Sequence, residues 1–174
     1  GAAVGAESTN TVSDVTAALV WDDQQDLYPD TYLEFERDVV EGSYECFNEQ
    51  SCDWLEADNA LLSSYPLGLT VRSEFVSQYR WVDLDEDGGR TASVYRTWMT
   101  SKPEVSFDFL DISDQFYLGA NIPLGDDHTL RLLASWVVAE IGESDVPEDF
   151  ALNLVIDSLI GSNTELDVWI DENL

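Results

Sequence analysis

The sequence predicts an α+β domain in which antiparallel strands pack against a long C-terminal helix. Two observations carry this prediction. Apolar and polar residues alternate in several stretches between residues 67 and 138, and a period of two is typical of strands with one buried face. Near the C-terminus the apolar residues recur every three or four positions instead, which is the spacing of one face of a helix.

The first part of the chain is expected to hold one strand and two short helices. Residues 11–21 are expected to form the first strand. Thr31 and Glu34 match a capping box, so residues 31–41 are expected to form a helix, although a strand also suits this stretch. Another short helix is expected around residues 53–62.

A long hairpin over residues 67–100 is expected at the centre of the fold. Its turn is rich in Asp and Gly, which tolerate the left-handed conformations of tight hairpins. If Asp83 and Arg90 are the last paired residues, Ser77 faces Arg96 and Arg96 lies on an otherwise apolar face. A turn that differs by one residue would place Arg96 on the solvent face instead.

Three further strands and the last helix are expected after the hairpin. Residues 105–109, 116–124 and 130–138 each alternate between apolar and polar positions. Asp145, Glu148 and Pro147 between them mark a helix start. The apolar stripe of this helix is Leu152, Ile156, Leu159, Leu166 and Ile170.

This order of elements resembles the START-like, or helix-grip, superfamily, and the C-terminal stretch with Gly161, Ser162 and Trp169 is similar to its closing helix. The resemblance implies a curved antiparallel sheet packed around the long C-terminal helix, with a cavity between them. It also implies binding of lipids, sterols or polyketides, or a cyclase activity. The long acidic stretch with two cysteines before the hairpin departs from the superfamily pattern. The alternative fold is a β-sandwich with a peripheral helix.

Length and charge narrow the classes of function. The chain has 174 residues, and we expect a flexible lead over residues 1–11 and a single α+β domain over residues 12–174. Its 36 acidic and 7 basic residues give a net charge of −29. Such a surface repels nucleic acid and anionic membranes. We interpret it as adaptation to a saline environment, with a cation-rich partner or a calcium-rich exterior as the alternative.

Cys46 and Cys52 are the only cysteines and lie close together in a polar stretch. We expect them to form a disulfide in an oxidising compartment, and the alternative is two reduced thiols. The only histidine, His128, lies far along the chain, which disfavours a zinc site. The small, polar start of the chain favours an exported protein, either periplasmic, at the cell surface or extracellular.

The central turn contains one candidate metal site. Asp83, Asp85 and Asp87, followed by Gly88, have the spacing of the first half of a calcium loop. The twelfth position, where an EF-hand has its bidentate Glu, is Val94. A solvated acidic turn is therefore the competing interpretation. No other cofactor is expected.

A cavity under the sheet would need a polar anchor, and Arg96 is the candidate. A buried arginine requires an acidic partner, which a ligand carboxylate or phosphate would supply. The alternative is an internal Asp or Glu. With Arg96, the expected ligand-binding residues are Phe75, Tyr79, Trp81, Trp98, Trp136, Leu152 and Ile156.

Three hypotheses for function follow. The first is an exported domain that binds a hydrophobic or amphipathic, lipid-like molecule between the sheet and the last helix. The second is a structural or interaction protein of the cell surface that self-associates, with a filled core and no ligand. The third is a cyclase-type enzyme. Catalysis is the least favoured, because the sequence has no nucleophile elbow, phosphate loop or H-E-x-x-H motif.

Overall fold

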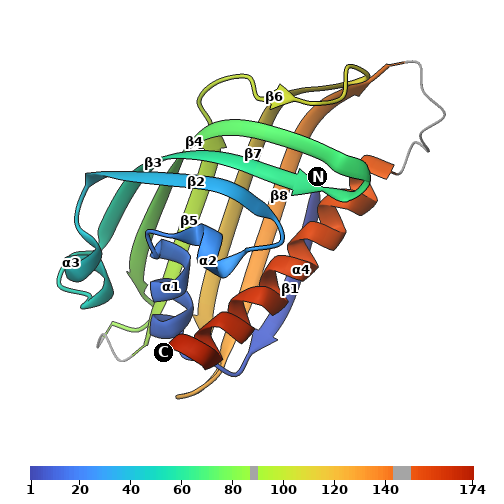
Figure 1. Cartoon of the computed structure of the whole chain (residues 1–174). Coiled ribbons are helices and arrows are strands. Elements are labelled where there is room, and N and C mark those ends of the chain that lie inside the picture. Colours follow the sequence, from blue (N-terminus) through green and yellow to red (C-terminus); the bar gives the residue numbers. More distant parts are fainter. Residues whose placement is uncertain (87–89, 143–149) are drawn as a thin grey trace.

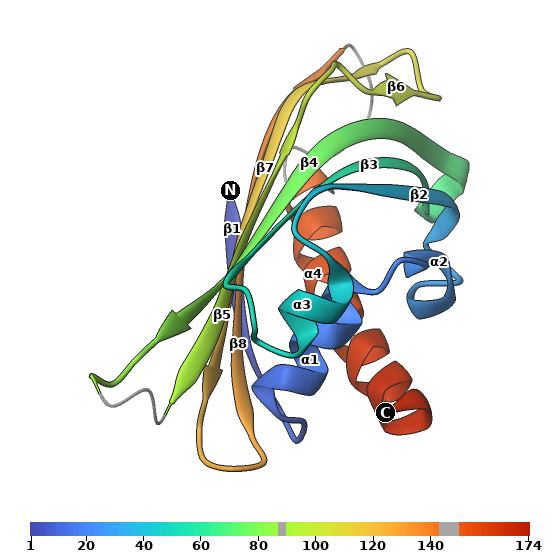
Figure 2. The ribbon, with the colours of Figure 1, turned by 90° about the vertical axis from the view of Figure 1, so that its left-hand side faces the viewer.

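The computed structural model describes residues 1–86, 90–142 and 150–174, and the side chains of residues 150–152 and 154 lie outside this description. An antiparallel sheet of eight strands curves around the C-terminal helix α4 (Phe150–Asn173), as Figure 1 shows. Viewed along the sheet, helices α1, α2 and α4 lie on its concave side (Figure 2). The predicted α+β fold is confirmed. The described strands belong to one sheet, so the sandwich alternative does not apply.

The described part of the chain contains eight strands, four α-helices and one 3-10 turn. In chain order they are β1 (Ala2–Ser8), α1 (Val12–Val20), α2 (Gln24–Leu27), β2 (Tyr32–Glu41), α3 (Tyr44–Asn48), β3 (Trp54–Tyr65), the 3-10 turn η1 (Pro66–Gly68), β4 (Leu69–Asp83), β5 (Thr91–Met99), β6 (Glu104–Val105), β7 (Leu110–Pro123), β8 (Thr129–Ile141) and α4.

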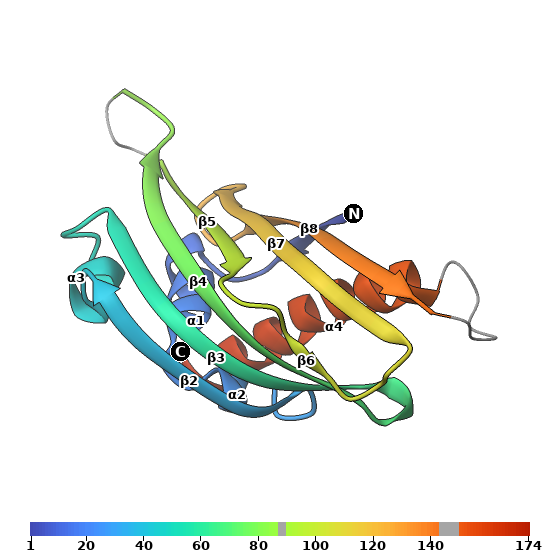
Figure 3. The same ribbon diagram turned by 90° about the horizontal axis from the view of Figure 1, so that it is seen from above.

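The strand order across the sheet is β1-β8-β7-β5-β4-β3-β2, and the short β6 pairs with β4. From above, α4 runs beneath β4 and β7 (Figure 3). Because side chains alternate along each strand, one set faces α4 on the concave, inner face and the other lies on the convex, outer face. We use the names inner face and outer face in this sense throughout.

The hairpin register predicted from the sequence is wrong by one residue. Asp83 pairs with Thr91 rather than with Arg90, so Ser77 lies opposite Thr97 and Arg96 lies opposite Gln78. Arg90 belongs to the turn, where its carbonyl accepts from the Leu84 amide at 2.8 Å. A one-residue slip moves every side chain of a strand to the other face. Arg96 therefore lies on the outer face.

The N-terminal predictions need a second correction. The expected flexible lead contains edge strand β1, which pairs with β8, and the expected first strand is helix α1. Thr11 caps this helix by accepting from the Asp14 amide at 3.2 Å. Val12 and Val15 are buried on one helical face, and this three-residue spacing was available in the sequence. Most residues of β1 are small, so its sequence lacks the alternation of large apolar and polar residues that predicts a strand.

The middle of the chain contains more strand than expected. Residues 31–41 and 53–62 were expected to be helical, yet they fall in the antiparallel pair β2 and β3. The strand alternative for the first stretch is therefore the correct one. Local capping signals were overridden by pairing in the sheet, because tertiary context outweighs helix propensity. Of the expected strand at 105–109, only Val105 is in a strand, at the end of the two-residue β6.

Helix α3 packs under the end of the sheet and carries the disulfide. Phe47 is fully buried and contacts Trp81, whose indole N–H donates to the Phe47 carbonyl at 2.8 Å. Cys46 and Cys52 are joined by a disulfide, which confirms the expected pairing. This bridge closes the short segment that holds Phe47 in the core.

Candidate ligand-binding cavity

A cavity of about 420 Å³ lies between the inner face of the sheet and helix α4. Its walls come from β2, β3, β4, β5, β7 and β8, with α1 and α2 closing one side. Eight aromatic side chains contribute to these walls, together with small hydroxyl and aliphatic residues. The tyrosines among them are Tyr28, Tyr32, Tyr65, Tyr79, Tyr95 and Tyr117.

Small hydroxyl residues make room for this cavity. On β4 the inner positions alternate between aromatic or aliphatic residues and serine, so Ser73 and Ser77 line the cavity beside Phe75. Ser77 shares a 3.0 Å hydrogen bond with Thr97 of β5. Gly119 of β7 provides space for the Tyr95 ring, because a Cβ at this position would overlap that ring. The cavity thus exists because small residues, Ser73, Ser77 and Gly119, occupy positions on the inner face.

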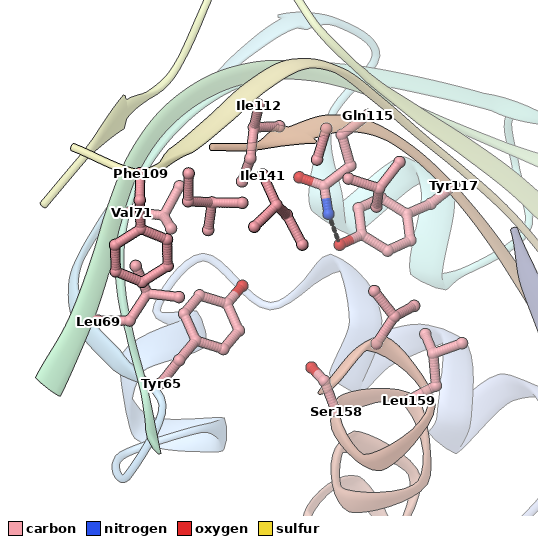
Figure 4. A pocket seen from close by; sticks show the side chains of 14 residues that line it. Tyr65, Leu69, Val71, Phe109, Ile112, Gln115, Tyr117, Ile141, Ser158 and Leu159 are labelled. Carbon is pink, nitrogen blue, oxygen red and sulfur yellow. Dashed lines mark hydrogen bonds between the residues drawn. The ribbon is translucent and has the colours of Figure 1, made fainter. Parts of the chain in front are cut away.

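A second chamber of about 80 Å³ adjoins the first (Figure 4). Both chambers are lined by Tyr65, Val71, Gln115, Tyr117, Ser158 and Leu159, so they share a boundary. The remaining lining of the smaller chamber is apolar, including Phe109 and Ile141. In Figure 4, the Gln115 amide donates to the Tyr117 hydroxyl at this boundary. The cavity therefore becomes more apolar towards the smaller chamber.

Arg37 of β2 is the basic residue that lines the larger chamber. Its Nε donates to the Asn59 Oδ1 at 2.7 Å, and an Nη2 hydrogen reaches the Tyr79 hydroxyl at 3.2 Å. Its Nη1 donates to the carbonyls of Leu19 at 3.2 Å and Trp21 at 2.9 Å. These acceptors fix the guanidinium in one orientation at the wall of the cavity.

The tyrosines of the cavity wall stay neutral at ordinary pH. Burial raises the pKa of Tyr95 to about 12, and it also raises the pKa of Tyr28 above its usual range. Burial likewise raises the pKa of Tyr32 and Tyr117 well above the usual value. A neutral phenol donates one hydrogen bond and accepts others. The cavity wall therefore offers O–H donors to oxygen atoms of a ligand.

Two carboxylates from α4 also line the larger chamber. Asp157 is exposed, and Glu165 is half-buried. Desolvation, followed by repulsion from Asp30, raises the pKa of Glu165. These groups give the α4 side of the chamber an acidic character that contrasts with the Arg37 side.

The structure brings two of the expected ligand-binding residues to the cavity. Phe75 and Tyr79 line the larger chamber. Trp81 is buried instead in the cluster around Phe47. Ile156 is half-buried on α4 but lines neither chamber, and the side chain of Leu152 lies outside the described part of the chain.

The other three expected residues lie on the outer face. Arg96 donates to the Gln78 side chain at 2.6 Å and stacks on Trp98, with its guanidinium carbon 5.2 Å from the ring centroid. Trp136 is 47% exposed and packs against Phe116. The structure thus separates this group from Phe75 and Tyr79. For Arg96 and Trp98 the reason is the register of β5. For Trp136 the reason is that Leu133 and Val137 of β8 line the cavity, so the alternate positions face outward.

The candidate calcium loop is only partly described, since Asp87 lies outside the described residues. Within the described part, the Asp85 carboxylate accepts two hydrogen bonds from Arg90, at 2.9 and 3.0 Å. The bond from Arg90 also lowers the pKa of Asp85. A calcium ion would have to compete with this guanidinium for the same oxygens.

The sequence interpretation missed Arg37. A strand over residues 32–41 would have placed Phe35, Arg37 and Val39 on one face, and all three are half-buried. The helix interpretation concealed this alternation. The tyrosine and serine pattern of β4 was visible in the sequence, but its partners on β3 and β7 depend on pairings that sequence patterns do not fix.

Comparison with known proteins shows the fold. No protein-family model and no curated protein sequence matches the chain. Among solved structures, a START superfamily protein from Mycobacterium smegmatis shares 12% identity with a TM-score of 0.59, covering 99% of this chain and 98% of its own. The Zhui aromatase/cyclase from Streptomyces sp. R1128 gives 12% identity and a TM-score of 0.59, with coverages of 98% and 92%.

Human STARD10 is similar over 98% of this chain and 63% of its own, with 8% identity and a TM-score of 0.57. At such low identities these similarities concern the fold and not the function. The predicted resemblance is confirmed at this level. The chain has a START-like, helix-grip fold.

Proposed function

We propose that this protein is an exported binding protein that holds a hydrophobic or amphipathic small molecule between the sheet and α4. The observation that carries the proposal is the cavity of about 420 Å³ with its wall of tyrosines. Pockets for small molecules typically measure about 300–1,000 Å³ and combine apolar walls with a few fixed polar groups. The tyrosine hydroxyls and Arg37 are such groups.

The cavity favours binding over a purely structural role. A filled core is the expected state of a protein interior, because interiors are packed as densely as organic crystals. Here small residues such as Ser73 and Ser77 occupy inner positions where larger ones would close the space. Self-association through the outer face is compatible with this proposal but does not explain the cavity.

Binding is also favoured over a cyclase-type reaction. The tyrosines of the cavity have raised pKa values, so they serve as hydrogen-bond donors rather than as bases near neutral pH. His128 lies in an exposed turn, where it pairs with Asp127 at 2.8 Å. Similarity to an aromatase/cyclase shows only the fold.

Export is supported by the disulfide between Cys46 and Cys52, since such bonds persist in oxidising compartments. Within the described residues, no helix is long and apolar enough to span a membrane. The net charge of −29 also suits a saline exterior, where salt screens repulsion among carboxylates.

Native mass spectrometry and titration with an apolar fluorescent probe test the binding function. We expect a co-purified small molecule, or saturable binding of the probe by the emptied protein. Ser158→Trp should abolish this binding, because Ser158 lines both chambers. The matched control is Thr164→Trp, at an exposed position of α4 that lines neither chamber. Absence of binding, or equal binding by both variants, would overturn the proposal.

A further inference from the structure

Arg37 has an unusual electrostatic environment for a partly buried arginine. Its four hydrogen bonds all go to neutral acceptors, namely the Asn59 amide oxygen, the Tyr79 hydroxyl and the carbonyls of Leu19 and Trp21. No ion pair joins it to a carboxylate in the described part of the chain. The protein has 36 acidic residues, yet none of those that the structure describes forms an ion pair with this positive charge.

Arg131 is a buried arginine that, unlike Arg37, lies close to a carboxylate. Its side chain is 4% exposed, and its Nη1 lies 3.9 Å from a carboxylate oxygen of Asp167. The same nitrogen donates to the Asn163 carbonyl at 3.2 Å. An internal carboxylate thus accompanies the buried cation between β8 and α4, as expected from the cost of an unpaired charge. Arg37 differs because it borders open space in the cavity.

The neighbours of Arg37 fix the orientation of its guanidinium group. Asn59 is buried, and its amide nitrogen donates to the carbonyls of Ala57 and Phe75, which fixes the oxygen that faces Arg37. The Arg37 guanidinium carbon lies 5.1 Å from the Phe35 ring centroid and 5.8 Å from that of Tyr79. Arginine has five N–H donors, and the bonds above engage four of them. The neutral Tyr44 hydroxyl is the nearby protein acceptor for the fifth, on Nη2, and it brings no negative charge to the guanidinium.

The lining of the rest of the cavity indicates the chemical class of the ligand body that carries an acceptor for Arg37. Along β4 the lining runs from Tyr79 beside Arg37 to Val71 at the smaller chamber, eight residues away. This separation corresponds to about 26 Å along a strand. The larger chamber combines aromatic rings with hydroxyl groups, and the lining of the smaller chamber is mainly aliphatic. A flat aromatic body with one polar end matches this gradient.

We propose that the natural ligand is an aromatic anion whose carboxylate, or equivalent ionised oxygen, binds Arg37. This inference rests on the proposed binding function and specifies its ligand class. The anion replaces the neutral Tyr44 hydroxyl as the second acceptor for Nη2 and neutralises the guanidinium, while the Tyr79 hydroxyl lies at the same end of the cavity. The aromatic body contacts Phe75 and Tyr95 and extends towards the smaller chamber.

Three probes with one skeleton test the ligand class: anthracene carboxylate, anthracene methanol and anthracene methylamine. They are titrated by fluorescence into the emptied wild-type protein and into Arg37→Met and Arg96→Met. Arg96→Met is the matched control, because it removes one arginine from the outer face with the same change in net charge. Each titration is carried out at 0.15 M and at 1 M NaCl, where the screening length is about 8 Å and about 3 Å. The comparison separates pairing with Arg37 from long-range repulsion of the anion by the acidic surface.

We expect wild type to prefer the carboxylate over the alcohol. Arg37→Met should weaken carboxylate binding by about 10- to 150-fold, the range for a lost hydrogen bond to a charged group. Its affinity for the alcohol should stay within about threefold of wild type. Arg96→Met should leave all affinities unchanged. Arg37→Lys, which keeps the charge but loses the planar fork, should retain part of the preference.

Each outcome decides between the two proposals. Equal binding of carboxylate and alcohol by wild type overturns the ligand class but leaves the binding function in place. Preference for the amine does the same, and identifies Asp157 and Glu165 as the selecting groups. Failure of all three probes to bind overturns the binding function itself. If Arg37→Met does not fold, the wild-type preference and the Arg37→Lys variant decide the result.

Discussion

The two faces of the sheet carry opposite kinds of surface. The inner face of β4 and β5 presents Phe75, Tyr79 and Tyr95 to the cavity, separated by serine and threonine. The outer face of the same strands presents Arg96 and Trp98. The difference shows that aromatic residues alone do not identify the ligand-binding side. Small hydroxyl residues between them distinguish the inner face, because they leave space.

The outer face is itself divided. On β2 and β3 it is acidic, with Glu34, Glu36, Asp38, Glu56 and Asp58 at alternate positions. On β7 and β8 it is apolar, and the exposed residues there are Leu118, Leu132, Trp136 and Val138. These apolar side chains are partly solvated, so they contribute less to stability than the clusters of the inner face.

The largest difference between the faces should appear when Phe47 of α3, which packs against the inner face, and Trp136 of the outer face are each removed. Phe47→Ala should lower the free energy of unfolding by about 3–5 kcal/mol, because Phe47 is fully buried against Leu55 and Trp81. Trp136→Ala should cost only about 1 kcal/mol, since Trp136 is 47% exposed. Urea unfolding measures both. Similar costs for the two variants would show that the outer apolar surface is covered in solution.

The disulfide under the inner face should have the next largest effect. Cys46 and Cys52 are six residues apart, so their bridge closes a short loop. The chain-entropy relation assigns such a loop about 2 kcal/mol of stabilisation. Replacing both cysteines with serine should lower the free energy of unfolding by that amount, measured by urea unfolding without reductant. Unchanged stability would mean that packing of Phe47 alone holds helix α3.

Much of the fold was predictable because alternation persists through β4, β7 and β8 and changes period in α4. The stripe of α4 is a clear case, since Leu159, Leu166 and Ile170 are buried as the spacing predicts. The disulfide was predictable from the short spacing of the cysteines in a chain with export-like features. These features depend on residues close in sequence.

The site was less predictable because it depends on register and on long-range pairing. A shift of one residue at the turn beside Arg90 was enough to exchange Arg96 for Thr97 on the inner face. Arg37 was missed because Thr31 and Glu34 also match a helix capping box, while the pairing of β2 with β3 decided the structure. Propensity and turn length are weak signals compared with these tertiary contacts.

Glycine substitutions should distinguish the faces with a smaller effect. A Cβ at Gly119 would overlap the Tyr95 ring in the cavity wall, whereas one at Gly5 would lie 3.3 Å from a flexible Leu132 side chain on the outer face. Gly119→Ala should cost about 1–3 kcal/mol and weaken ligand binding. Gly5→Ala should stay within about 0.5 kcal/mol of wild type. Thermal melts and probe titration check both, and the reverse order would refute this assignment of faces.

The smallest expected effect concerns the acidic half of the outer face. Asp38 and Asp58 lie directly opposite each other on β2 and β3, and like charges in this position are destabilising. Asp58→Lys replaces repulsion with attraction, so the melting temperature should rise by roughly 1–3 °C at low salt. In 1 M NaCl, where the screening length is about 3 Å, most of this gain should disappear.

The control for Asp58→Lys is Asp126→Lys, which makes the same change in net charge at an exposed turn between β7 and β8. It should raise the melting temperature less, because no strand residue lies opposite it. Wild type itself should become more stable from low to molar NaCl, since a net charge of −29 opposes compaction. If both variants gain equally, overall charge rather than the opposed pair on β2 and β3 limits stability. If wild type does not respond to salt and Asp58→Lys gains nothing, the acidic half of the outer face is already spaced widely enough to tolerate its charge.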